Sequence, residues 1–195
     1  RLGLVRPGLY DALVGAMVEL SRRHPRAQLK IALPHISTAR ELAALRNQVV
    51  ESFRRRDATP PPIGAVIGVP HACLEAREVA VHADFLAFDT HALTELVFGA
   101  GREDTAAYLH RYIHELEVFD GDPFVRFDEN GVGRLIRAGA ARARTRRRDL
   151  PMSLVGEVAG EPPAVRLAAE LGMTGVACPP TRLLVARVAA AQSAA

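Results

Sequence analysis

Short apolar runs alternate with amphipathic stretches along most of this 195-residue chain. An apolar run of about four to eight residues indicates a buried strand, and an amphipathic stretch indicates a helix that packs on it. The alternation therefore predicts repeated βα units whose strands form a parallel sheet. The predicted strands are residues 29–33, 63–67, 84–88, 152–155 and 175–178. The predicted helices are residues 7–23, 38–55, 72–82, 93–98, 103–114, 131–147, 163–171 and 182–192.

These strands are too few for a closed (β/α)8 barrel, which needs eight strands and about 250 residues. The fold class is therefore predicted to be α/β, with about five of the eight βα units of a TIM barrel. An open sheet edge would leave backbone groups unpaired, so we expect either further strands upstream or a covering partner chain. Because the chain begins with Arg1 rather than Met, we expect it to be part of a longer protein. Residues 1–192 are expected to belong to one domain, and residues 193–195 to a frayed tail.

The composition excludes several classes of protein. The apolar fraction is 49% with only 5% aromatic residues, which suits layers filled by Val, Leu, Ala and Ile. A net charge of +3 is too small to indicate a nucleic-acid partner. Two cysteines do not form a disulfide framework, so a reducing, cytoplasmic location is expected. Without an apolar run of membrane-spanning length, no membrane partner is expected either.

The most informative segment is residues 84–102. Its apolar run, residues 85–88, ends in Asp89, Thr90 and His91, and a helix is expected from residue 92 or 93. In a parallel α/β protein, ligands bind where strands end and helices begin, because backbone N–H groups and the helix dipole converge there. We therefore expect a site at this position.

This segment resembles a signature of the phosphoenolpyruvate (PEP)-utilising enzymes, which reads roughly D-F-F-S-F-G-T-N-D-L-T-Q-x-T-F-G-x-x-R. Other segments resemble further motifs of that family in the same order, and they are residues 31–36, 63–72, 122–124, 131–135, 155–162, 176–180 and 186–192. Residues 122–124 and 131–135 are similar to the pyruvate phosphate dikinase branch. The resemblance implies a C-terminal PEP/pyruvate-binding barrel, which exchanges phosphoryl between PEP and a phosphohistidine domain with Mg²⁺ as cofactor.

The residues that carry the chemistry in that family are replaced in this chain. The resemblance implies that its Mg²⁺-binding Glu and Asp correspond to Gly68 and Ala92, and its substrate-binding Asn to His91. Its acidic Cys corresponds to Val155, and the His that follows corresponds to Val158. We therefore expect no catalytic residue, no resident metal and no cofactor in this chain.

Two interpretations of the remaining polar residues stay open. Asp89 and His91 could substitute weakly for the lost metal ligands, and an imidazole with a carboxylate suits zinc or manganese better than magnesium. Alternatively, they belong to a relic loop whose hydrogen bonds are satisfied. Thr90, His91 and Glu157 are the candidate substrate-binding residues. Glu157 could instead pair with an arginine such as Arg182 and be structural.

Other chemically capable groups have structural interpretations that we favour. His110 and His114 share one face of a predicted helix, but a third metal ligand is needed, so we expect a solvated face. Cys73 and Cys178 are expected to be small buried hydrophobic residues. His71 replaces a family Arg and is expected to cap the following helix. A basic run without interleaved aromatic residues is expected at a helix C-terminus, and it comprises Arg142, Arg144, Arg146, Arg147 and Arg148.

Two functional hypotheses from different classes follow. The first is a divergent or truncated phosphotransferase domain that is inactive alone and binds PEP or pyruvate weakly at most. The second is a non-catalytic interaction module that keeps the dimerising surface of the barrel and forms a homodimer. The sequence leaves open whether the chain is an enzyme.

Overall fold

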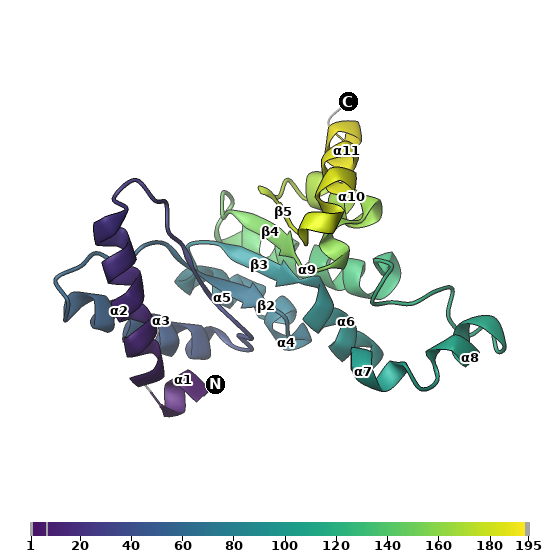
Figure 1. Ribbon diagram of the computed structural model, residues 1–195, viewed down its shortest axis with the longest axis horizontal. Helices are drawn as coiled ribbons and strands as arrows, with labels where there is room; N and C mark the ends of the chain where they lie inside the picture. The colour runs from purple at the N-terminus through teal and green to yellow at the C-terminus, as the bar shows by residue number, and fades with distance from the viewer. Residues whose placement is uncertain (1, 7, 194–195) are drawn as a thin grey trace.

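The computed structural model describes residues 2–6 and 8–193, and its centre is a parallel sheet (Figure 1). The strand order follows the chain, β1-β2-β3-β4-β5, and each neighbouring pair is parallel. This order confirms the predicted α/β class. The strands are β1 (Ile31–Leu33), β2 (Ile63–Ile67), β3 (Leu86–Asp89), β4 (Met152–Val155) and β5 (Gly175–Ala177).

Helices fill the connections between the strands, as expected for right-handed βα crossovers. The α-helices are α1 (Leu2–Val5), α2 (Gly8–Arg23), α3 (Ala39–Arg54), α4 (Pro70–Leu74), α5 (Ala76–His82), α6 (Thr90–Phe98), α7 (Arg102–Thr105), α8 (Leu109–His114), α9 (Arg134–Arg146), α10 (Pro162–Glu170) and α11 (Leu183–Ser193). Short turns of other helix types are η1 (Glu129–Gly133), η2 (Val158–Gly160) and η3 (Pro180–Arg182). None of the helices in the described part of the chain is both long and apolar enough to cross a membrane.

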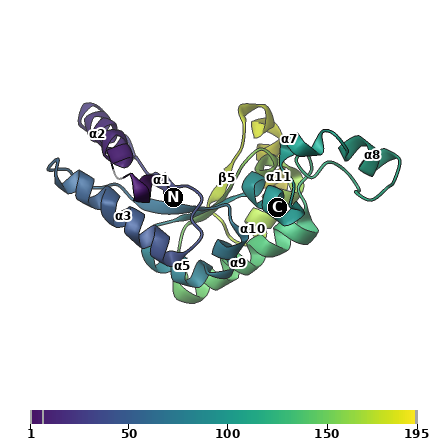
Figure 2. The ribbon, with the colours of Figure 1, turned by 90° about the horizontal axis from the view of Figure 1, so that it is seen from below.

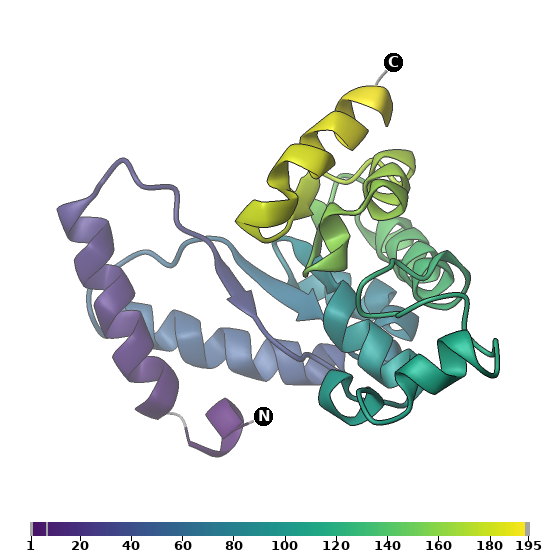
Figure 3. The same cartoon turned by 45° about the vertical axis from the view of Figure 1, so that its right-hand side comes forward.

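The sheet is arched, with α3, α5 and α9 along its outer side (Figure 2). Helices α2 and α11 stand at opposite ends of the arch (Figure 3). Side chains alternate between the two faces of a strand, so Leu86, Phe88 and Leu154 are fully buried under the outer helices. Ala32 and Ala177 point to the inner side of the arch and are exposed. The described residues thus form an open arc rather than a closed barrel.

Several predicted helices are interrupted in the structure. The helix predicted at residues 72–82 is divided into α4 and α5 at Glu75. The backbone angles of Glu75, φ −91° and ψ 11°, are no longer those of an α-helix. The helix predicted at residues 103–114 is divided into α7 and α8. The helix predicted from residue 131 begins with η1, where the Asp128 carboxylate accepts backbone hydrogen bonds and starts the turn early.

The two ends of the chain also differ from the prediction. Helix α11 continues through Ser193, whose hydroxyl donates to the carbonyl of Ala189, so this residue is not frayed. The other tail residues, 194 and 195, lie outside the described residues. The predicted start of the first long helix at residue 7 also lies outside them, and α2 is described from Gly8.

Candidate functional site

The C-terminal ends of the strands converge where β3 leads into α6. The carboxylate of Asp89 accepts hydrogen bonds from the backbone N–H groups of His91 and Ala92, at 3.0 and 3.1 Å. An Asp in this N-cap position satisfies donors that the first helical turn leaves unpaired. The helix therefore begins at Thr90, two or three residues before the predicted start. Both hydrogen bonds are accepted by the same carboxylate oxygen, Oδ1 of Asp89.

Thr90 joins the ends of two neighbouring strands. Its side chain is fully buried, and its hydroxyl donates to the carbonyl of Val155 at 3.1 Å. The next residue of β4's loop, Gly156, adopts φ +125°, and a Cβ there would lie 2.4 Å from the Thr90 oxygen. Glycine is thus required at residue 156 because of its positive φ and because a Cβ would collide with the Thr90 hydroxyl. Thr90 holds the site together, and its role in substrate binding stays a prediction.

The two positions that correspond to the family's metal ligands are neighbours across the site. A Cβ built on Gly68 would lie 2.9 Å from the Cβ of Ala92 and 3.7 Å from Nδ1 of His35. Both positions are buried, and neither side chain offers an oxygen atom. A side chain added at residue 68 would therefore meet the methyl group of Ala92.

Glu157 forms an ion pair, but its partner is not the residue suggested from sequence. Its carboxylate accepts a hydrogen bond from Arg102 at 2.7 Å, whereas Arg182 donates to Glu161 at 2.7 Å. The hydrogen bond from Arg102 lowers the pKa of Glu157, partial burial opposes that shift, and the charge of Arg102 adds to it. Glu157 is therefore an ionised carboxylate at the rim, 38% exposed.

His91 is the most accessible of the candidate substrate-binding residues. Its ring packs at a tilt against Phe124, with 5.7 Å between centroids. Its Nε2 lies 3.6 Å from a carboxylate oxygen of Glu95, and 40% of its side chain is exposed. The imidazole therefore lies on the first turn of α6 with one edge open to solvent.

These residues do not fit a magnesium ion. Mg²⁺ requires near-octahedral oxygen coordination, in proteins usually through one or two carboxylates with water and substrate. One oxygen of Asp89 caps α6, and Glu157 is paired with Arg102. Within residues 2–6 and 8–193, no group of three or more His, Cys, Asp or Glu side chains could hold a metal ion. The suggested substitution of the lost ligands by Asp89 and His91 therefore lacks a third donor.

The structure also places the groups that we interpreted as structural. The rings of His110 and His114 lie 4.7 Å apart on an exposed face of α8. Cys73 is fully buried, which raises its pKa to about 12, and Cys178 is half-buried. The imidazole of His71 lies 2.9 Å from the carbonyl oxygen of Ser37, so it links the first turn of α4 to the loop before α3 and does not cap α4.

Arg102, which pairs with Glu157 at the edge of the site, was not among the predicted site residues. It is the last residue of the family-like segment 84–102, so its position in that motif was a usable signal. The contact with Glu157 spans 55 residues and required the structure. Phe124, which packs against His91, was missed for the same reason.

Comparisons with known proteins agree with the geometry. The family described as PEP-utilising enzyme, PEP-binding domain matches residues 1–195. The chain is 32% identical over 203 residues to pyruvate, phosphate dikinase of Rickettsia prowazekii, covering 99% of this chain and 23% of that protein. It is 35% identical over 201 residues to pyruvate, phosphate dikinase 2 of Oryza sativa subsp. japonica, covering 98% of this chain and 22% of that protein.

A third relative, pyruvate, phosphate dikinase of Clostridium symbiosum, is 33% identical over 170 residues, covering 85% of this chain and 19% of that protein. The chain thus spans less than a quarter of the length of the curated relatives it matches. The family match covers the whole sequence, and the parallel sheet is consistent with a domain of this kind. The chain belongs to the PEP-utilising enzymes, within their PEP-binding domain.

Proposed function

We propose that this chain is a PEP-binding domain of the pyruvate phosphate dikinase type whose metal site has been lost. In this proposal the domain does not hold Mg²⁺ and does not by itself transfer phosphoryl between PEP and a phosphohistidine. The observation that carries the proposal is the proximity of Gly68 and Ala92, which have no side-chain oxygen where the family has two carboxylates: a Cβ built on Gly68 would lie 2.9 Å from the Ala92 Cβ. Phosphoryl transfer depends on neutralising charge in the transition state, so loss of the metal removes most of the catalysis.

The remaining polar residues support weak anion binding at most. His91 exposes one edge of its ring, but Glu95 and Glu157 contribute negative charge around it. Val155 stands where the family has an acidic Cys, so no thiol is available there to protonate an enolate. The nearby Arg102 and Arg182 are already paired with Glu157 and Glu161, so we expect PEP or pyruvate to bind weakly at most.

We also propose that the five βα units belong to an eight-stranded barrel. The parallel strands follow the chain order and the helices lie on the outer side of the arch, which supports a segment of such a barrel. Strands β1 and β5 are the two ends of the arc. Further strands between them would pair their free edges and cover the inner face.

Isothermal titration calorimetry of the purified chain with PEP, in the presence of Mg²⁺ or Mn²⁺, tests the loss of the metal site. The expected result is no metal-dependent heat at sub-millimolar PEP. Metal-dependent heat in that range contradicts the proposal. A matched variant, Gly68→Glu combined with Ala92→Asp, returns both carboxylates and is expected to bind Mn²⁺ once the start of α6 shifts to admit the side chain at residue 68. Each single variant supplies one new carboxylate and is expected to bind the ion more weakly.

A non-catalytic, homodimerising module is the second candidate function. It is favoured by large apolar side chains exposed on the helices at both ends of the arch. On α2 these are Leu9 and Leu13, and on α11 they are Leu184 and Val188. Such residues lie at protein contacts more often than on a monomer's free surface when they gather on one element. Sedimentation velocity over a range of concentrations distinguishes a dimer from a monomer.

A further inference from the structure

An acidic segment projects from the body of the protein. Residues 109–122, here called the acidic arm, comprise α8 and the loop that follows it, and they extend away from the sheet (Figures 1 and 3). The arm carries four carboxylates and one arginine, a net charge of −3 with histidine neutral. Its residues Leu116 and Val118 are 53% and 57% exposed. The arm therefore presents negative charge together with apolar surface.

Aromatic contacts fix the arm in place. The ring of Phe119 packs edge-on against Phe98 of α6 and against Tyr112 of α8, with centroids 5.5 and 5.4 Å apart. Tyr112 also packs against Tyr108 at 4.9 Å. The carboxylate of Glu115 pairs with Arg111, whereas Glu117 and Asp120 form no ion pair within the described part of the chain. Two carboxylates are thus held on a packed scaffold with no intramolecular partner.

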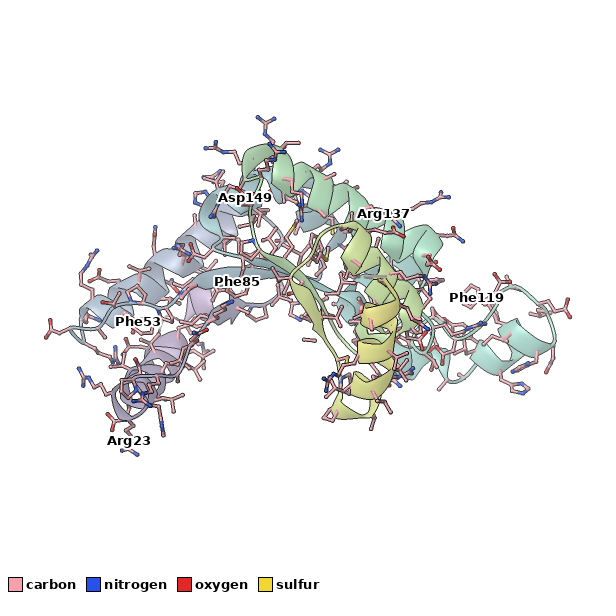
Figure 4. All side chains as sticks on the ribbon, turned by 90° about the horizontal axis from the view of Figure 1, so that it is seen from above. Arg23, Phe53, Phe85, Phe119, Arg137 and Asp149 are labelled. Carbon is pink, nitrogen blue, oxygen red and sulfur yellow. The ribbon has the colours of Figure 1, made fainter. Side chains whose placement is uncertain are left out.

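A basic surface lies on the outer helical layer. The side chains of Arg142, Arg146 and Arg148, here called the arginine stripe, are exposed at the C-terminal end of α9. Figure 4 shows nitrogen-tipped side chains pointing outward around the labelled Asp149. Arg142 and Arg146 are four residues apart on one helix, so their like charges repel. A bound anionic surface would relieve that repulsion.

The neighbouring arginines already have structural partners. Arg144 donates to the carbonyls of Leu171 and Gly172, Arg147 donates to the carbonyl of Ala83, and Arg137 pairs with Glu170. These contacts, together with the helix dipole, explain why cations occur at this end of α9. They do not involve the arginine stripe. Its residues form no ion pair among residues 2–6 and 8–193.

We propose that the acidic arm of one copy docks on the arginine stripe of a second copy. The arm points away from α9 of its own chain (Figure 2), so it cannot neutralise the stripe within one molecule. The two surfaces carry opposite charge, and such complementarity steers association and selects the partner. The exposed Leu116 and Val118 add apolar contact beside the carboxylates. This inference rests on the homodimer of the second candidate function and assigns it a contact that is separate from the apolar faces of α2 and α11.

Sedimentation velocity with charge-reversal variants tests the proposal. The wild-type chain is expected to self-associate at about 0.05 M salt and to dissociate at about 0.5 M, where charges are strongly screened. An arm variant, Glu115→Lys, Glu117→Lys and Asp120→Lys, is expected to weaken association at least about tenfold. A stripe variant, Arg142→Glu, Arg146→Glu and Arg148→Glu, is expected to do the same. A mixture of the two variants is expected to associate again, because each carries one intact and complementary surface.

A matched control reverses two exposed arginines outside the arm and the stripe, Arg26→Glu and Arg40→Glu, and is expected to leave association unchanged. Circular dichroism verifies that each variant is folded. The proposal is overturned if the wild-type chain stays monomeric at low salt, or if it associates equally well in both reversal variants. The second outcome leaves a homodimer intact and rejects only the docking surface, and neither outcome bears on the loss of the metal site.

Discussion

Gly68 lies against Ala92 so closely that a Cβ on Gly68 would be 2.9 Å from the Ala92 Cβ. In the proposed function these two positions correspond to the family's metal-binding carboxylates, and both are small residues in this chain. Any side chain at residue 68 must displace the start of α6 or the methyl group of Ala92.

Gly68→Ala is expected to lower the free energy of unfolding by about 1–3 kcal/mol, because overpacking a buried contact forces neighbouring atoms to move. Adding Ala92→Gly removes the obstructing methyl group, so the double variant should be more stable than the sum of the single effects. Urea unfolding of the four proteins measures this coupling. Gly175→Ala is the control, since nothing lies within 4 Å of its added Cβ. If the changes in unfolding free energy at residues 68 and 92 are additive, a side chain at residue 68 does not meet the Ala92 methyl group.

Thr90→Val is expected to destabilise the protein by about 1–3 kcal/mol, because it leaves the buried carbonyl of Val155 without its donor. Thr90→Ser keeps the hydroxyl and should lose less stability than Thr90→Val. Thermal or urea unfolding compares the two variants. If serine costs as much as valine, the methyl group of Thr90 matters more than its hydrogen bond.

The order and direction of the strands could be predicted because each strand is a separate apolar run. Residues 63–67 and 152–155 were predicted with the bounds that the structure gives. Helix interruptions were harder to predict, because Glu75 carries no glycine or proline signal and its backbone departs from helical geometry only slightly. The amphipathic pattern continues through such a break. Periodicity alone therefore joins helices that the backbone separates.

At the candidate site, interactions between residues close in the sequence could be predicted from it, and interactions between distant residues could not. The Asp89 cap has a local signature, an Asp shortly before a helix, but the prediction assigned Asp89, Thr90 and His91 to the strand end and began the helix at residue 92 or 93. The ion-pair partner of Glu157, in contrast, could not be identified from the sequence. Arg102 and Arg182 both lie near it in the structure, and only the folded geometry selects Arg102 for the ion pair.

The two thiols should differ strongly in reactivity. Cys73 is fully buried with a pKa of about 12, whereas Cys178 is half-buried. Because the thiolate is the reacting form, a thiol reagent at about pH 8 should label Cys178 first and Cys73 only on unfolding. Cys178→Ser is expected to abolish the fast phase. The prediction is wrong if Cys73→Ser abolishes it instead.

Asp11 should make the stability of the protein sensitive to acid. Its carboxylate accepts hydrogen bonds from Arg56, Ser52 and Arg55, which hold its pKa well below the ordinary value. A carboxyl whose pKa is depressed in the folded state contributes stability above its unfolded pKa of about 3.9 and loses it as the pH falls. The urea midpoint should therefore fall between about pH 5 and pH 3 more steeply in the wild type than in Asp11→Asn. Equal pH dependence in both proteins would show that the hydrogen bonds to Asp11 do not contribute to the acid sensitivity of the stability.

Arg102→Met tests whether the lowered pKa of Glu157 depends mainly on Arg102. The hydrogen bond from Arg102 is the largest cause of the lowered pKa of Glu157, and Arg182 and His91 contribute by charge alone. Without Arg102, the pKa of Glu157 should rise toward its ordinary value of about 4.3, because the remaining charges act without a hydrogen bond. A carbon-detected NMR titration of the Glu157 carboxyl measures the change. Arg182→Met is the matched control: it breaks the pair with Glu161 and should raise the pKa of Glu157 less. An equal rise in both variants would mean that the general positive charge of the rim, rather than the ion pair, keeps Glu157 ionised.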